Sequence, residues 1–185
     1  MLKSVRALLV DWPTTMFIPR TPPTSGGKTL GDAAIRSQWE AYANARLKGG
    51  VCDTLHVLAH VQHLRIVPLS QCGRSITTVH HGRLWANLPV TDSVCEEDGS
   101  GVFQVFKGME RAGVEDVRHV LRVSQHADLL EEASRAGVHM CGVGGEFDFR
   151  GVHPRQHGRP GQVLLGVDTL DELIPLLSSL CRTPL

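Results

Sequence analysis

The chain has 185 residues, with 19 lysines and arginines, 19 aspartates and glutamates, and no formal net charge at neutral pH. This length is enough for one domain with a single substantial core. Balanced charge without long basic runs speaks against nucleic acid or an anionic membrane surface as the partner. No apolar run approaches the ~20 residues of a membrane span, and no secretory signal is recognisable at the N-terminus.

Cysteine usage fits an intracellular protein. Five cysteines are an odd number, and none of them forms a CxxC pair: Cys52, Cys72, Cys95, Cys141 and Cys181. Without an export signal, such cysteines are expected to be reduced thiols. We therefore expect a soluble cytoplasmic protein.

Strand-like and helix-like segments alternate along the chain. Short apolar runs indicate strands, and longer amphipathic runs that stop at glycine indicate helices. The expected strands are Val5–Val10, Leu64–Leu69, Leu88–Thr91, Val117–Val123, Val138–Val143 and Val163–Leu165. The expected helices are Asp32–Leu47, Cys52–Gln62, Val102–Ala112, His126–Ala136 and one that begins after Thr169.

This alternation predicts a Rossmann-like α/β fold, in which helices cover both faces of a parallel sheet. Val138–Val143 is apolar with little alternation, as expected of a strand that is buried on both faces. We find no internal repeat and no low-complexity segment. Residues 1–185 are therefore expected to form a single domain.

Asp11 is the first candidate functional residue. It ends the apolar run from Val5, and Pro13 follows two positions later. Open α/β sheets bind their ligands beyond the carboxyl ends of the strands. A carboxylate at this position is a candidate nucleophile or metal ligand.

Three stretches of the chain resemble the haloacid dehalogenase superfamily, most closely its phosphonoacetaldehyde hydrolase-like branch. Val5–Thr15 is similar to the first motif of that branch. Phe103–Val123 is similar to the helix, turn and strand that lead to its acidic motif. Leu129–Val143, followed at a distance by Gly166–Leu177, is similar to its closing helix, strand and last helix. Together these stretches cover about half of the chain.

The resemblance implies a three-layer fold with a short helical cap insert at residues 19–62. It also implies hydrolysis of a small phosphorylated or phosphonate metabolite through an aspartyl nucleophile. In that family the first-motif aspartate attacks phosphorus, while Mg²⁺ and cationic side chains screen the phosphoryl charge. A homodimer is an open alternative for the assembly.

Five residues match functional positions of the family. The resemblance implies Asp11 as the nucleophile and a Mg²⁺ ligand, with Asp128 as a second ligand. It implies Ser70 and Thr15 for substrate binding, and Lys28 for an imine with an aldehyde substrate. Each has a structural alternative, because Ser70 and Asp128 can cap helices and a glycine-flanked lysine is commonly a surface residue.

Other positions depart from the family pattern. Pro13 stands where ordinary phosphatases of the family carry an acidic general acid, and it offers no backbone N–H to a phosphate. Thr14 replaces a glycine of the same loop. Gln125 replaces the first carboxylate of the fourth motif, although Mg²⁺ prefers charged oxygen ligands. Gly99 stands at the third-motif cation, which leaves Lys107 as the nearest positive charge. These losses support a second hypothesis, a catalytically degenerate relative that acts by binding or assembly.

A histidine stripe suggests a third, weaker hypothesis of a metal-binding protein. Cys52, His56, His60 and His63 fall on one side of the helix expected over Cys52–Gln62. Histidines four residues apart can share a transition metal. The apolar residues of this helix lie on the opposite arc, so the stripe is expected to be its solvent face.

Overall fold

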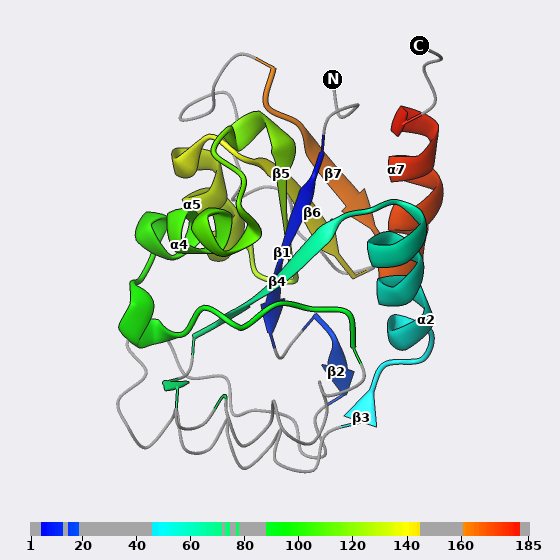
Figure 1. The fold of residues 1–185 in the computed structure, drawn as a ribbon, viewed down its shortest axis with the longest axis horizontal. Coiled ribbons are helices and arrows are strands. Elements are labelled where there is room, and N and C mark those ends of the chain that lie inside the picture. Colours follow the sequence, from blue (N-terminus) through cyan, green and yellow to red (C-terminus); the bar gives the residue numbers. More distant parts are fainter. Residues whose placement is uncertain are drawn as a thin grey trace.

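A computed structural model describes residues 5–12, 15–18, 46–71, 88–144 and 161–181, together with Gly73, Arg74 and Thr77. At its centre is a five-stranded parallel sheet in the order β4-β1-β5-β6-β7 (Figure 1). Its strands are β1 (Ala7–Trp12), β4 (Arg65–Ser70), β5 (Val120–Ser124), β6 (His139–Val143) and β7 (Leu164–Val167).

Among the described residues, helices lie between β1 and β4, between β4 and β5 and between β5 and β6, and they cover both faces of the sheet (Figure 1). On one side lie α4 (Val102–Ala112) and α5 (Ala127–Ala136). On the other side lie α2 (Val51–His56), the π-helical turn η1 (Val57–Val61) and the C-terminal helix α7 (Leu173–Cys181). The predicted three-layer Rossmann-like α/β fold is therefore confirmed.

Alternating side chains of β1 enter two separate cores. Leu8 and Val10 pack with the residues of α2 and α7, whereas Leu9 packs with the residues of α4 and α5. Strand geometry sends every second side chain to the same face. Asp11 therefore shares the face of Leu9, and Trp12 returns to the core beneath α2.

Helices α4 and α5 begin and end close to the predicted positions. Each ends at a glycine with left-handed backbone geometry, Gly113 (φ 62°) and Gly137 (φ 82°). The amides of both glycines donate to carbonyls of the preceding turn, as in the common glycine C-cap. The two glycines were therefore sufficient to predict where these helices end.

The insert after β1 differs from the expectation at its C-terminal end. Arg46–Leu47 is a short strand, β3, that pairs antiparallel with β2 (Phe17–Ile18), although a helix was predicted to run through Leu47. Residues 32–45 of that predicted helix lie outside the described residues.

Residues 51–61 of the predicted 19–62 cap belong to the main body of the fold. Val51, Leu55 and Leu58 are buried against the sheet in the same core as Trp12. This segment thus belongs to a layer of the sheet domain. Residues 19–45 lie outside the described part of the chain.

The stretch after β4 also departs from the expectation. Leu88–Thr91 forms no strand. Thr91 N donates to Ile66 O at 2.8 Å, and Leu88 packs in the same core as Ile66. Further on, Val94 makes an isolated parallel bridge to Leu69. Among the residues described, no helix is long and apolar enough to cross a membrane.

Candidate functional site

Asp11 lies at the carboxyl edge of the sheet, inside β1 rather than in the loop after it. It is opposite Leu69 of β4, and the next pair along the two strands is Trp12 and Ser70. Only 2% of Asp11 is exposed to solvent. The structure thus brings two of the predicted site residues, Asp11 and Ser70, to neighbouring strand ends.

The carboxylate of Asp11 is bound by Arg122 of the adjacent strand β5. Arg122 Nη2 donates to Asp11 Oδ1 at 2.8 Å, and Arg122 Nε donates to Oδ2 at 3.1 Å. The Arg122 side chain has no solvent exposure. A bidentate guanidinium–carboxylate pair is a strong, charge-assisted contact that fixes the orientation of both groups. Asp11 is therefore fully engaged inside the protein.

Glu132 of α5 extends this contact to the surface. Arg122 Nη1 lies 3.3 Å from Glu132 Oε2, and the Glu132 side chain is 27% exposed. Burial raises the pKa of Glu132 above its usual value, against the opposing effect of Arg122. Burial alone would lower the pKa of Arg122, but the attraction and hydrogen bonds of Asp11 and Glu132 raise it overall.

Sequence analysis did not identify Arg122 or Glu132 as site residues. A signal was nevertheless present, because Arg122 stands within the otherwise apolar and small sequence Val120–Ser124. Arginine is almost never fully buried unless it is paired. An arginine in a strand of a sheet that helices are predicted to cover on both faces therefore suggests a carboxylate beside it.

The side chain and backbone of Ser70 take part in several hydrogen bonds. Ser70 is fully buried. Its hydroxyl oxygen accepts from Thr77 Oγ1 at 3.1 Å, and its carbonyl accepts from Gln104 Nε2 at 2.7 Å. Gln71 in turn donates to Gln104 Oε1 at 3.0 Å. These contacts fix the end of β4 to helix α4.

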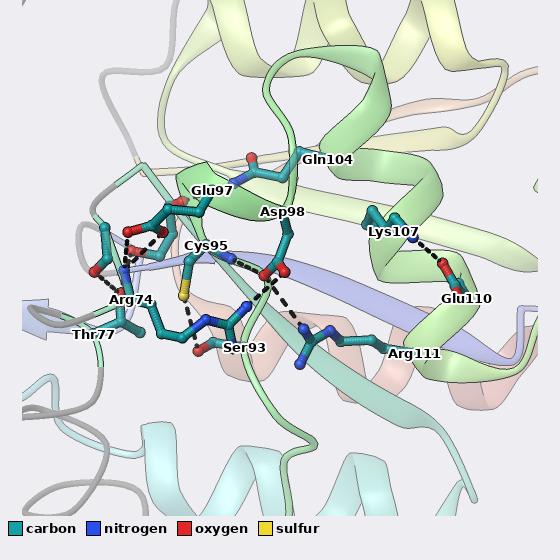
Figure 2. A network of polar contacts seen from close by, with 12 residues as sticks. Arg74, Thr77, Ser93, Cys95, Glu97, Asp98, Gln104, Lys107, Glu110 and Arg111 are labelled. Carbon is teal, nitrogen blue, oxygen red and sulfur yellow. Dashed lines mark hydrogen bonds and ion pairs between the residues drawn. The ribbon is translucent and has the colours of Figure 1, made fainter.

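The segment that corresponds to the third motif carries acidic residues, and basic side chains bind them. Figure 2 shows Arg74 and Arg111 converging on Asp98, with Nη2–carboxylate distances of 2.6 and 3.3 Å. The backbone N–H of Arg74 also donates to both carboxylate oxygens of Glu97. Lys107 is exposed and pairs with Glu110 of its own helix at 2.7 Å (Figure 2). The basic side chains of this region therefore form ion pairs with nearby acidic residues.

Thr15 lies after β1 and lines a small cleft at the carboxyl edge of the sheet. The cleft has a volume of about 70 Å³, and its walls include Lys48, Thr54, Gln125 and Asp168. The Thr15 hydroxyl is buried and has no hydrogen-bond partner in the described part of the structure. Burial also lowers the pKa of Lys48. The cleft thus combines an unsatisfied hydroxyl with charged and amide groups.

The residues at the predicted magnesium site do not fit a magnesium ion. Both oxygens of Asp11 accept hydrogen bonds from Arg122, and Gln125 offers only a neutral amide. Asp128 is exposed in the first turn of α5, where its Oδ1 accepts from the amide of Leu129. Within the described ranges, no three or more His, Cys, Asp or Glu residues are grouped so as to hold a metal.

Three further positions of the predicted site, Lys28, Pro13 and Thr14, lie outside the described residues.

For the histidine stripe, His60 and His63 are exposed and His56 is half-buried. The rings of His56 and His60 stack with centroids 5.5 Å apart. The stripe was predicted for a regular α-helix, whereas Val57–Val61 is a π-helical turn with a different number of residues per turn.

Solved structures with a similar fold include dehalogenases and haloacid dehalogenase-like hydrolases. A dehalogenase with an intermediate complex aligns with 96% of this chain and 99% of its own, at 14% identity and a TM-score of 0.72. A phosphonoacetaldehyde hydrolase-like protein from Oleispira antarctica aligns with 98% of this chain and 94% of its own, at 15% identity and a TM-score of 0.69.

A third similar structure, a putative hydrolase of the same superfamily from Bacillus subtilis, is bound to magnesium. It aligns with 95% of this chain and 99% of its own, at 14% identity and a TM-score of 0.68. Comparisons with family models and with curated proteins gave no match. The described part of the chain thus has the fold of these haloacid dehalogenase-like structures.

Proposed function

We propose that this chain is a catalytically degenerate protein with the haloacid dehalogenase fold, and that it acts by binding rather than by phosphoryl transfer. The observation that carries the proposal is the bidentate contact of Arg122 with Asp11. A nucleophilic carboxylate needs a free oxygen directed at phosphorus, in a site that admits substrate. Here both oxygens are engaged and the residue is buried.

The remaining departures point in the same direction. Proline at position 13 cannot protonate a leaving alkoxide, and general acid catalysis typically contributes ~10²–10⁴-fold. Gln125 supplies no charge for a metal. The cations of the third-motif region bind Asp98 and Glu110. No free cation would therefore screen the repulsion between a dianionic phosphoryl group and the buried carboxylate that has to attack it.

The cleft beside Thr15 is the place where we propose that a small polar ligand binds. An unsatisfied buried hydroxyl carries a desolvation cost that a ligand or water can remove. Lys48 and Asp168 supply opposite charges on the wall of the same cleft. Thr15→Val removes the hydroxyl and keeps the shape. It is expected to leave stability unchanged or slightly increased, and to weaken ligand-induced thermal shifts in a screen of small polar metabolites.

The decisive experiment measures hydrolysis of an alkyl phosphate, such as glycerol phosphate, with excess Mg²⁺. We expect no turnover above the level of Asp11→Asn, with folding of both proteins checked by circular dichroism. p-Nitrophenyl phosphate is unsuitable because nitrophenolate leaves without a proton. Robust alkyl phosphate turnover that Asp11→Asn abolishes would refute the proposal.

A second candidate is a phosphonatase-like hydrolase that acts on a phosphonate metabolite. It is favoured by the position of Asp11 beside Ser70 at the carboxyl edge. This candidate requires the Asp11–Arg122 pair to open when substrate binds, and Lys28 to form an imine with an aldehyde. Borohydride treatment with phosphonoacetaldehyde would then trap a covalent adduct in the wild type but not in Lys28→Arg. We expect no adduct in either protein.

A further inference from the structure

The cleft beside Thr15 is formed by three separate parts of the chain. Thr15 follows β1, Lys48 lies between β3 and α2, and Asp168 follows β7. Thr15 is buried, whereas Asp168 and Asp171 are exposed. Within the described ranges the Thr15 hydroxyl has no hydrogen-bond partner. The buried side of the cleft therefore offers a polar group that the fold itself does not use, and such a group is costly unless it is satisfied.

Charges of both signs line the same cleft. Asp168 and Asp171 supply two carboxylates on its exposed side, and Lys48 supplies an ammonium group. Lys48 is half-buried, and burial lowers its pKa. Water therefore solvates this ammonium group less well than it solvates a surface lysine, and a nearby carboxylate would stabilise its charged form. The lining thus suits a ligand that carries both an anionic and a cationic group.

The volume of the cleft restricts the size of the ligand. It is about 70 Å³, whereas an apolar cavity of about 150 Å³ in another protein holds a benzene ring. By this comparison the cleft encloses roughly three to four non-hydrogen atoms, and any further group lies at its exposed side. A nucleotide or a sugar phosphate is too large to be enclosed here.

We propose that the cleft binds a short amino acid as a zwitterion. Its carboxylate would bind Lys48 and the Thr15 hydroxyl, and its ammonium group would bind Asp168 and Asp171. This proposal rests on the proposed function, because it names the class of small polar ligand that the cleft takes. A ligand with a carboxylate alone would meet the two aspartates, and one with an ammonium group alone would meet Lys48. A zwitterion has a complementary partner for each of its charges.

Isothermal titration calorimetry of the whole chain tests this ligand class directly. The zwitterionic probes are glycine and β-alanine, and the matched probes of similar size are acetate, methylammonium and acetamide. Small ligands make few contacts and bind weakly, so each is titrated to about 10 mM, at constant ionic strength because salt screens charges. We expect saturable binding of at least one of the two zwitterions and of none of the other three probes.

Three variants assign the binding to the cleft. Lys48→Gln should weaken it by at least about tenfold, because a charge-assisted hydrogen bond is lost in a half-buried position. Asp168→Asn should weaken it by about two- to fivefold, since exposed ion pairs contribute less. The matched control is Asp92→Asn, which changes an exposed aspartate outside the cleft and should bind as the wild type does.

The proposal is overturned if neither zwitterion binds the wild type, or if acetate, methylammonium or acetamide binds as tightly. It is also overturned if Lys48→Gln and Asp168→Asn, shown by circular dichroism to be folded, bind as the wild type does. Alkyl phosphate turnover is a separate measurement. Turnover would refute the degenerate function even if amino acids bind, and an absence of amino acid binding leaves the result of the hydrolysis test unchanged.

Discussion

A carboxylate that accepts two N–H donors of one buried guanidinium is held in a single orientation. For Asp11 this partner is Arg122, and neither side chain has more than 3% exposure. Removing one partner of such a pair leaves a buried charge without compensation, whereas replacing both with apolar groups is often neutral. We therefore expect each single substitution to be strongly destabilising, although the pair as a whole contributes little to net stability.

This reasoning gives a prediction for the Asp11–Arg122 pair. Asp11→Leu and Arg122→Met should each lower the free energy of unfolding by about 3–5 kcal/mol. The double variant should lose clearly less than the sum of the two. Urea denaturation of the four proteins gives the coupling energy as a double-mutant cycle. Additive losses would show that the two side chains do not depend on each other.

Cysteine reactivity provides a second prediction for single residues. Burial raises the pKa of the Cys141 thiol to about 12, and this side chain has no exposure. Since the thiolate is the reactive form, Cys141 should not react with Ellman's reagent in the native protein. Cys52 is half-exposed and should react.

Two serine variants test this difference. Cys52→Ser should remove one thiol from the reaction of the native protein, whereas Cys141→Ser should change only the total measured in denaturant. A slower or smaller native reaction in a folded Cys141→Ser protein would contradict the prediction.

At the scale of whole elements, local signals in the sequence were sufficient for most of the sheet and its helices. Val102–Ala112 was predicted with the bounds that the structure shows, because an amphipathic run stops at Gly113. The short strand Arg46–Leu47 was missed, since its hydrogen-bond partner is Phe17–Ile18, far away in the sequence. A segment of two residues is too short to show the alternating pattern by which a strand is recognised in a sequence.

The candidate site was predictable only in part, for a related reason. The position of Asp11 at the carboxyl edge follows from a local pattern, namely an apolar strand that ends in a carboxylate. Its pairing with Arg122 joins residues 111 positions apart, and the contact of Arg122 with Glu132 depends on how α5 packs. Neither contact could be inferred from a motif, although the buried arginine itself was visible in the sequence.

The packing of α4 on the sheet leads to a third prediction. A Cβ atom at Gly108 would lie 2.8 Å from Leu9 Cδ2 and 3.2 Å from Leu69 Cδ2. Both leucines are fully buried, so they have little room to move. Alanine favours a helix over glycine by up to ~1 kcal/mol, but overpacking typically costs ~1–3 kcal/mol.

Gly108→Ala should therefore destabilise the protein by roughly 1 kcal/mol in a urea titration. Gly49→Ala is the matched control, because a Cβ there would have no atom within 4 Å. It should be neutral or slightly stabilising, since alanine restricts the unfolded chain. A Gly108→Ala protein as stable as the wild type would mean that α4 can move away from β1 and β4 at little cost.

At the scale of the whole molecule, the two edges of the sheet carry different chemistry. The carboxyl edge holds the Asp11–Arg122–Glu132 cluster and the cleft beside Thr15. Nearer the other edge, His139 of β6 joins the neighbouring segments. Its Nε2 contacts Arg118 O at 3.0 Å, before β5, and its Nδ1 accepts from Val163 N at 3.1 Å, before β7. This pattern assigns the neutral ring, with Nε2 as the donor.

The stability of the whole fold should therefore depend on pH through His139. Burial lowers the pKa of His139, against a weaker opposing effect of the hydrogen bond to Arg118. A histidine whose folded pKa lies below its unfolded value, about 6.5, contributes fully above that value and progressively less as the pH falls through it. Protonation would also remove the acceptor that Val163 N requires. We expect the free energy of unfolding to fall below pH 6.5 by at most about 1.4 kcal/mol per pH unit from this residue.

Urea titrations at pH 7.5 and 5.5 measure the effect, and two variants assign it. His139→Gln should lower stability at both pH values, because glutamine cannot make both contacts, and should reduce the difference between them. His60→Gln changes an exposed histidine and should leave the pH dependence of the wild type intact. If the acid loss persists undiminished in His139→Gln, other groups are responsible, and this contact does not couple the three strands to pH.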